Sequence, residues 1–264
     1  MQKVTIVIPN YNGRRLLENC LKTLENQTYT DFKVLIIDNG STDGSKEIIS
    51  DTLDMEMVSL ETNLGFCGAV NLGIQMTNTP YIILLNNDTE TDRYFVETLL
   101  KAIERSEKIF SCGAQMIDFQ NHKILDNAGD LYTAMGWAVA RGKGKRCIDY
   151  EKKKRVFSCC AGAAIYRMDI LNQIGGLDEH HFAYLEDVDL GYRARIHGFE
   201  NWYIPEAKVY HVGSATTGAR YNEKKVFLAA RNTIFVIYKN MPFLQILLNF
   251  TFVFIGILIK ILFF

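Results

Sequence analysis

Apolar residues in the first hundred positions of the chain follow two alternating patterns. Short continuous apolar runs, typical of buried strands, occupy residues 4–8, 34–37, 57–60 and 81–85. Between them, apolar residues recur every three or four positions. This spacing predicts helices over residues 16–24, 69–76 and 94–103, and the start of another helix at 46–49. The alternation predicts an α/β fold with a mostly parallel sheet and helices on both faces.

Beyond residue 105 the pattern is less regular. A glycine-rich loop is expected around residues 129–144, and a strand followed by a helix within 157–174. Two short strands are expected near 202–204 and 209–211.

The C-terminal segment is the most apolar part of the chain. Residues 243–259 form a run of 17 residues without a charge, and the apolar run continues past Lys260 to the last residue. This length is near the lower limit for a helix that spans a membrane, while a helix buried in a protein core is the alternative. We expect residues 241–264 to form a membrane-associated helix, because four phenylalanines would otherwise need a large protein surface to cover them.

The charge of the chain limits which kinds of partner it can bind, and its cysteines indicate the cellular compartment in which it works. The chain has 29 Lys and Arg against 30 Asp and Glu, so no overall basic field favours nucleic acid as a partner. A local basic cluster at 141–146 and 152–155 fits a solvated loop, with anionic lipid or a phosphate-bearing substrate as alternatives. The six cysteines form no C-x-x-C pair, and a strand begins at residue 4 without a signal peptide. These features predict a reducing, cytoplasmic location.

Polar clusters follow three of the predicted strands, at residues 10–13, 38–41 and 86–88. Ligands of open α/β sheets bind at the carboxyl ends of strands, so the three clusters are expected to form one site. The chain contains no G-x-G-x-x-G motif, which argues against a dinucleotide-dependent oxidoreductase.

An acidic segment at residues 175–193 holds five carboxylates and two histidines beside apolar residues. Glu186, Asp187 and Asp189 would complement the positive N-terminal end of a helix, which is the simplest interpretation of their position. The alternative is that one of them is a catalytic acid or base, since such groups need a fixed and partly shielded carboxylate.

Together these clusters resemble glycosyltransferase family 2, whose members have the GT-A fold and use nucleotide-diphosphate sugars. The resemblance covers residues 3–240 and is closest to rhamnosyltransferase-like enzymes of bacterial cell-surface glycans. It rests on six segments in the family's order: Val7-Ile-Pro-Asn-Tyr-Asn12, Ile37-Asp-Asn-Gly-Ser-Thr-Asp43, Asn63-Leu-Gly-Phe66, Asn86-Asn-Asp88, Phe182 to Arg193, and His211-Val-Gly-Ser214. It implies a nucleotide-binding half at 1–105 and an acceptor and catalytic half at 106–240.

The resemblance also implies a nucleotide site. Its residues would be Pro9, Tyr11, Asp38, Gly68, Asn71 and Asn87. Asp38 would accept the N3–H of uracil or thymine, whereas cytosine has no hydrogen there. An Asx turn with Asn39 and Gly40 is the alternative role for Asp38. Gly68 and Asn71 are expected to open a helix whose free amides suit a phosphate or ribose.

The resemblance implies a site for a divalent metal, Mn²⁺ or Mg²⁺. Asn86, Asn87 and Asp88 stand where the family carries an Asp-x-Asp motif, but Asn86 replaces the first acid, so the site loses one negative charge. Asp88 is the stronger ligand candidate. His211 matches a family histidine that completes such a site, although without the resemblance it would be taken for an ordinary residue at a strand end.

Asp187 matches the general base of the inverting family members, and Glu186 is expected to support it or to position the acceptor. Trp137 would either stack on a sugar or belong to a core or lid. The expected activity is transfer of a sugar, such as rhamnose, from a UDP- or dTDP-sugar to a glycan or lipid-linked glycan at the inner face of the cell membrane. Two alternatives are a nucleotide-sugar-binding pseudoenzyme, favoured by the loss of acid at Asn86, and a membrane-anchored interaction protein.

Overall fold

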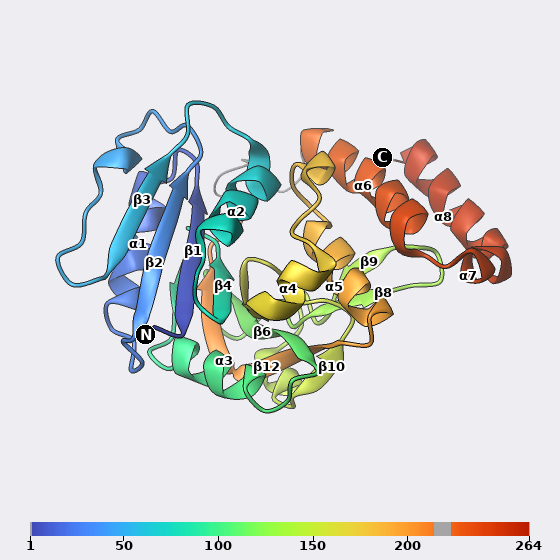
Figure 1. Ribbon diagram of the computed structural model, residues 1–264. Coiled ribbons are helices and arrows are strands. Elements are labelled where there is room, and N and C mark those ends of the chain that lie inside the picture. Colours follow the sequence, from blue (N-terminus) through green and yellow to red (C-terminus); the bar gives the residue numbers. More distant parts are fainter. Residues whose placement is uncertain (1, 214–222, 264) are drawn as a thin grey trace.

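A central sheet crosses the protein in the computed structural model, which describes residues 2–213 and 223–263 and side chains up to residue 260 (Figure 1). Ten strands of the described chain belong to this sheet, whose main path runs β10-β12-β6-β11-β4-β1-β2-β3. The first four strands in sequence are β1 (Val4–Asn10), β2 (Phe32–Asp38), β3 (Met55–Ser59) and β4 (Tyr81–Leu85). All four are parallel, so their carboxyl ends lie at one edge.

The other half of the sheet is mixed. Its strands are β5 (Thr89–Thr91), β6 (Ile109–Asp118), β7 (Leu125–Asn127), β10 (Lys154–Val156), β11 (Ala163–Arg167) and β12 (Glu200–His211). Strand β11 lies antiparallel between β4 and β6, whereas β6 and β12 are parallel. The α/β fold class is therefore confirmed, with a sheet that is mixed rather than mostly parallel.

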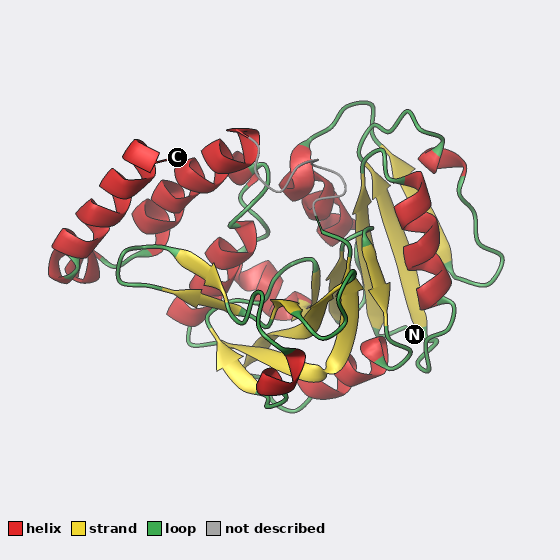
Figure 2. Cartoon of the chain, turned by 180° about the vertical axis from the view of Figure 1, so that it is seen from behind, coloured by secondary structure: helices red, strands yellow, loops and turns green. Residues whose placement is uncertain are grey.

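Helices cover both faces of the sheet, as Figure 2 shows from behind. On one face, α1 (Arg14–Leu24) and α3 (Phe95–Ile103) pack with apolar side chains of β1 and β2 such as Ile6 and Ile36. The other face carries α2 (Gly65–Met76), α4 (Met168–Ile174) and α5 (Glu186–Ile196), packed on the alternate residues Val7 and Leu35. The period of two along buried strands thus divides the core into two layers.

Three local expectations need correction. Residues 45–49 form only a 3₁₀ turn (Ser45–Glu47), because the chain becomes extended at Ile48 (φ −71°, ψ 126°). The two short strands near the end of the sheet are one strand, β12, with an irregular register between Ile204 and Lys208. The glycine-rich loop contains a small hairpin of β8 (Asp130–Tyr132) and β9 (Ala138–Ala140).

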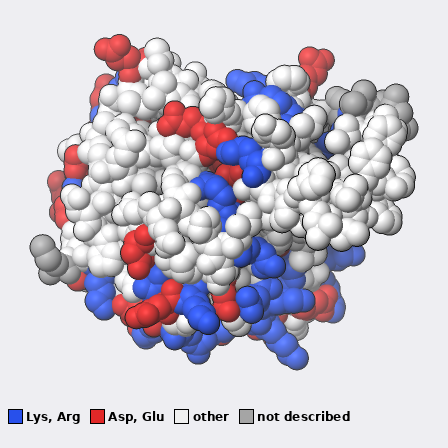
Figure 3. Space-filling model, turned by 45° about the vertical axis from the view of Figure 1, so that its right-hand side comes forward, with Lys and Arg blue, Asp and Glu red and all other residues white. Residues whose placement is uncertain are grey.

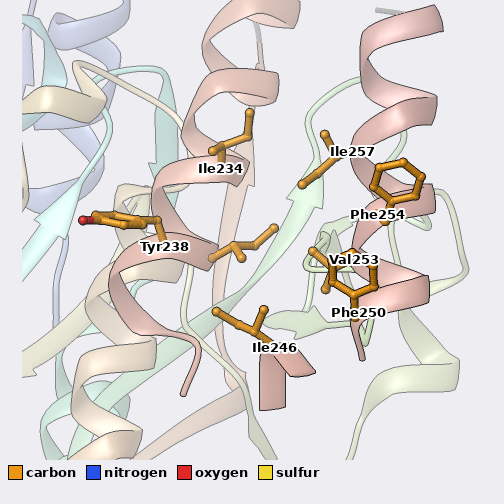
Figure 4. A pocket seen from close by; sticks show the side chains of 8 residues that line it. Ile234, Tyr238, Ile246, Phe250, Val253, Phe254 and Ile257 are labelled. Carbon is orange, nitrogen blue, oxygen red and sulfur yellow. The ribbon is translucent and has the colours of Figure 1, made fainter. Parts of the chain in front are cut away.

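The C-terminal part consists of α6 (Glu223–Asn240), α7 (Phe243–Leu248) and α8 (Phe250–Phe263), which stand beside the sheet (Figure 1). The apolar run is broken at Asn249, so the expected single helix is two helices. None of the helices in the described residues has the length and apolar character needed to cross a membrane. An apolar groove of about 280 Å³ lies between α6 and α8, bordered by side chains such as Ile234, Ile246 and Val253 (Figure 4).

Candidate active site

The three polar clusters meet at the carboxyl edge of the parallel strands. Asn87, which follows β4, donates a hydrogen bond from Nδ2 to Asn10 Oδ1 at the end of β1 (2.7 Å). Asn10 Nδ2 in turn donates to Asp38 Oδ2 at the end of β2 (3.0 Å). All three side chains are buried, and β4, β1 and β2 are neighbours in the sheet. The sheet topology itself therefore brings these residues together.

Asp38 is fully buried and already has partners on both carboxylate oxygens. Besides Asn10, the backbone amide of Ser41 donates to Asp38 Oδ1 (2.9 Å), which closes an Asx-type turn of the kind weighed for this residue. Contact of Asp38 with a nucleotide base remains a prediction. In the same loop Tyr11 is 37% exposed and Pro9 is half-buried, so both side chains are accessible to a ligand at this edge.

Gly68 and Asn71 do not open a helix, contrary to expectation. Helix α2 begins at Gly65, which places Gly68 in its first turn and Asn71 in its second. The side chain of Asn71 instead binds the acidic segment: its Nδ2 donates to Leu177 O (2.8 Å) and to Glu179 Oε1 (2.9 Å). Asn71 therefore connects α2 to the acidic segment.

Asp88 and His211 meet as the resemblance implied. His211 Nε2 lies 3.3 Å from Asp88 Oδ1, and its Nδ1 lies 2.8 Å from Asp126 Oδ2. Burial alone would lower the pKa of His211, but the hydrogen bonds with Asp126 and Asp88 raise it to about 9. Asp126 also contacts Lys143 (2.6 Å) and is a residue that sequence reasoning missed. Ser214, the last residue of the histidine motif, lies outside the described residues.

This pair fits one side of a metal site. Asp126 orients the His211 ring through Nδ1, and Nε2 faces Asp88. A cation bound beside Asp88 would displace the Nε2 proton and take this nitrogen as a ligand, and a carboxylate behind a ligating histidine is a common arrangement. The described residues contain no group of three or more His, Cys, Asp or Glu side chains placed to hold a metal ion.

Asp187 lies at the start of α5, as the acidic segment predicted. Its Oδ1 accepts from the Val188 amide (2.8 Å) and its Oδ2 from the Ala161 amide (3.2 Å). Burial raises its pKa, and the backbone amides oppose that rise only in part. Beside it, Glu186 is only 7% exposed, and its Oε2 has no hydrogen-bond partner in the described structure. Burial and the charge of Asp187 raise the pKa of Glu186 well above its ordinary value.

Another buried carboxyl, Asp130, lies beside Asp187 and was also missed. It accepts hydrogen bonds from Asn127 Nδ2 (2.9 Å) and Ser158 Oγ (3.1 Å). Burial, followed by the charge of Asp187, raises its pKa to about 7. Asp126 lies in β7 and Asp130 begins β8, and each of these strands has three residues. Only the sequence Asn-Ala-Gly separates the two acids. The closely spaced pair of acids was the only available signal, because strands this short show no periodicity.

One loop, residues 161–162, links the strand end that carries Asp88 to the acidic segment. The Asn86 amide donates to Gly162 O (2.9 Å), while the preceding residue, Ala161, donates its amide to Asp187. A Cβ atom on Gly162 would come within 2.9 Å of Asn86 Nδ2, so any larger residue there would displace the Asn86 side chain. Two consecutive residues thus join the ends of β4 and α5 across the site.

Trp137 does not stand free to stack on a sugar in this structure. Its ring faces the ammonium of Lys260 on α8 at 5.6 Å, and its indole Nε1 is buried against α8 near Gly256. The packing role considered for this residue is the one observed.

Comparison with known proteins agrees with this geometry. The description "Glycosyl transferase family 2" matches residues 5–175. The chain is 26% identical to the N-acetylglucosaminyl-diphospho-decaprenol L-rhamnosyltransferase of Mycobacterium tuberculosis, over 86% of this chain and 84% of the relative. Among solved structures, S. aureus TarS residues 1–349 with UDP-GlcNAc match with a TM-score of 0.63 at 17% identity, covering 98% of this chain and 72% of that one.

A mannosyltransferase from Pyrobaculum calidifontis, solved with GDP-Man and Mn²⁺, has the same fold. Its TM-score is 0.65 at 14% identity, and the match covers 90% of this chain and 63% of that one. The structural likenesses establish the GT-A fold, and the matched segment, about two thirds of the chain, establishes the family. The chain belongs to glycosyltransferase family 2 and is a glycosyltransferase.

Proposed function

We propose that this enzyme is an inverting glycosyltransferase that transfers a sugar, such as rhamnose, from a UDP- or dTDP-sugar to a lipid-linked glycan. The observation that carries the proposal is the placement of Asp187. Its carboxylate lies across the loop at 161–162 from the strand end that bears Asp88 and His211. A base on one side and a diphosphate site on the other suit attack on the anomeric carbon from opposite the leaving group.

In this mechanism the acceptor hydroxyl oxygen bonds to the anomeric carbon while the bond to the diphosphate breaks. Asp187 takes the hydroxyl proton, and the diphosphate leaves with the electron pair. Backbone amides on both oxygens fix the orientation of the carboxylate, and its raised pKa makes it a better proton acceptor. Glu186 and Asp130 favour a proton near Asp187, because three neighbouring carboxylates, two of them buried, resist full ionisation.

Asp88 and His211 would hold a divalent ion, Mn²⁺ or Mg²⁺, with Asn86 contributing at most an amide oxygen. Such an ion would neutralise charge on the departing diphosphate. Asp38 and the neighbouring loops would shape the base pocket, with Pro9 and Tyr11 on its accessible side and Asn87 fixing the end of β1.

The lipid-linked acceptor is supported by the C-terminal helices and by the name of the Mycobacterium relative, an N-acetylglucosaminyl-diphospho-decaprenol L-rhamnosyltransferase. Apolar side chains on α7 and α8 are widely exposed, with Phe243 at 80% and Leu248 at 75%. The single charged residue of these helices, Lys260, points inward and hydrogen-bonds Thr233 Oγ1 on α6 (2.5 Å). The outer face is therefore uncharged, and the surface over the C-terminal helices is mostly white in Figure 3.

We assign this face to the surface of a membrane, since contiguous exposed apolar area marks an interaction site. The six cysteines are free thiols, which suits the cytoplasmic side of the membrane. In a flotation assay with vesicles of mixed anionic lipids, the full chain is expected to float. The double variant Phe243→Asp/Leu248→Asp should remain at the bottom, while Ile49→Asp, an equally exposed apolar position on the sheet side, should float. Equal flotation of all three would contradict the assignment.

The donor is tested by thermal shift and calorimetry with UDP, dTDP, GDP and CDP, each with and without Mn²⁺. The proposal expects stabilisation by UDP or dTDP that grows with Mn²⁺. Transfer from the matching sugar nucleotide to a lipid-diphosphate acceptor should yield a product of inverted anomeric configuration. Binding of GDP alone would overturn the donor assignment, and a retained configuration would overturn the role of Asp187.

A further inference from the structure

The acidic segment enters α5 through an unusually strained loop. The loop consists of residues 182–185. Phe182, Tyr184 and Leu185 have φ values of 62°, 72° and 65°, although none of them is glycine. At Phe182 (ψ −56°) the Ala183 amide donates back to His181 O (2.7 Å), which forms a γ-turn of the rare, strained type. Residues rarely adopt these angles unless their surroundings enforce them.

Two consecutive residues of α6, Arg231 and Asn232, hold the loop in this conformation by hydrogen bonds to carbonyl groups within it and just before it. The Nδ2 atom of Asn232, a fully buried residue, lies 3.0, 2.9 and 2.7 Å from the carbonyl oxygens of His181, Ala183 and Tyr184. Arg231 Nη2 donates to His180 O (2.7 Å) and His181 O (3.0 Å), and Arg231 Nε donates to Asn232 Oδ1 (3.0 Å).

The loop is held from its other side by α2. Phe182 O accepts from the Cys67 amide (3.1 Å), and the Phe182 ring lies so close to Gly65 that a Cβ there would come within 2.5 Å. The carbonyls of the loop therefore face donors on α2 and α6, and little freedom remains for the residue that follows.

That residue is Leu185, which caps the N-terminus of α5 without any side-chain hydrogen bond. The direction in which Glu186 and Asp187 leave the loop is thus set by its backbone angles. The buried stripe of α6 continues the contact: Leu228, Asn232, Val236 and Asn240 recur every four residues, and Asn240 Nδ2 donates to Asp189 Oδ1 on α5 (2.7 Å).

We infer that Arg231 and Asn232 are positioning residues, which hold the loop at 182–185 in the strained conformation that aims Asp187 at the acceptor. Helix α6 then belongs to the catalytic apparatus, although it lies beyond the segment that matches the family description. The inference rests on the proposed role of Asp187 as the base.

The test compares Asn232→Ala with Asn240→Ala in the full chain. Both remove a buried amide of α6 that contacts the α5 segment, but only Asn232 binds the loop. We expect Asn232→Ala to lower kcat by roughly 10²-fold, as misplacement of a catalytic group by about 1 Å does, while the donor Kd stays within about twofold. Asn240→Ala should reduce thermal stability and keep kcat within about threefold of wild type.

A rescue experiment separates positioning from general damage. Glycine adopts positive φ without strain, so Leu185→Gly should restore part of the lost kcat in the Asn232→Ala background and do little for Asn240→Ala. If Asn232→Ala fails to fold, Arg231→Gln replaces it, since this residue is partly exposed; we expect a fall in kcat of about tenfold with unchanged donor Kd.

Normal kcat in a folded Asn232→Ala or Arg231→Gln variant would overturn the inference, as would an equal loss in Asn240→Ala. These outcomes are distinct from failure of the proposed function. In that case the wild-type enzyme itself would bind no UDP or dTDP, or Asp187→Asn would turn over normally.

Discussion

The carboxyl edge of the parallel strands, where we propose that the donor binds (the donor edge), and the acidic segment are built by different means. At the donor edge, Asn10, Asp38 and Asn87 end regular parallel strands, and their side chains form one short chain of hydrogen bonds. In the acidic segment, residues 182–185 have strained backbone angles, and Glu186 keeps a buried oxygen without a partner. The first region is placed by the sheet, and the second by contacts between elements distant in sequence.

This difference separates the expected effects of substitution. A change at the donor edge removes hydrogen bonds and should act on nucleotide affinity. A change in the acidic segment acts on strain and buried charge, so it should alter turnover and pH dependence with little effect on donor binding.

The largest effect is expected for Asp187→Asn. Asparagine keeps the size of the side chain but takes no proton at neutral pH, so kcat should fall by roughly 10²–10⁴-fold at unchanged donor Kd. Glu186→Gln is the matched control and should cost less, because its assigned role is support. Near-normal turnover with only a modest loss of stability would favour the interpretation that these acids merely complement the helix dipole.

Asp38→Ala should weaken UDP or dTDP binding by about 1.5–3 kcal/mol, because the Asn10 amide and the Ser41 N–H lose their acceptor and the loop loses its shape. Isothermal calorimetry measures the change directly. Asp43→Ala, in the same loop but exposed, serves as control. Unchanged affinity in a folded Asp38→Ala protein would remove this residue from the nucleotide site.

Asp126→Ala should weaken Mn²⁺ binding about 10–100-fold, because the His211 ring loses the carboxylate that orients it. Calorimetric titration of the protein with Mn²⁺ in the presence of UDP gives the affinity independently of turnover. Lys143→Gln, which removes only the cation beside Asp126, should have a small effect. If EDTA leaves activity undiminished, the metal assignment itself is wrong.

The smallest effect concerns stability. Because the pKa of Asp130 is raised from 3.8 to about 7, the folded state binds more protons than the unfolded state between these pH values, and the free energy of unfolding falls as pH rises through that range. Asp130→Asn should remove this loss and stabilise the protein at pH 8 by on the order of 2 kcal/mol. Denaturant unfolding at pH 5 and pH 8 tests it; a pH dependence identical to that of wild type would contradict the buried charge.

The sequence predicted the donor edge well because its signals are local. Each of the apolar runs that became β1, β2 and β4 is followed directly by polar residues, and parallel strands bring those ends together. The partnership of Asp88 with His211 also followed from motif order. The placement of Asn71 did not, because α2 begins four residues earlier than the apolar spacing indicated.

The acidic segment was found by its composition, but its construction was not predictable. Phe182, Tyr184 and Leu185 give no local sign of left-handed angles, which are ordinarily associated with glycine or asparagine. The stabilising donors lie some fifty positions later, and Asn232 in isolation is a poor helix former with no evident partner. Likewise, α7 ends before Asn249 and α8 begins after it, and hydropathy alone does not resolve this break.

The loop at 161–162 has a consequence for substrate choice. It connects the Asn86 backbone to the Asp187 carboxylate through two residues. With a diphosphate bound at Asp88 and His211, as we propose, this connection would hold the distance between the diphosphate and the base constant. Every donor bound by its diphosphate would then place its anomeric carbon at the same distance from Asp187, whatever sugar it carries. The choice of sugar would therefore depend on the side chains that surround the sugar ring. Substitutions there would change the product of the enzyme without changing the catalytic chemistry.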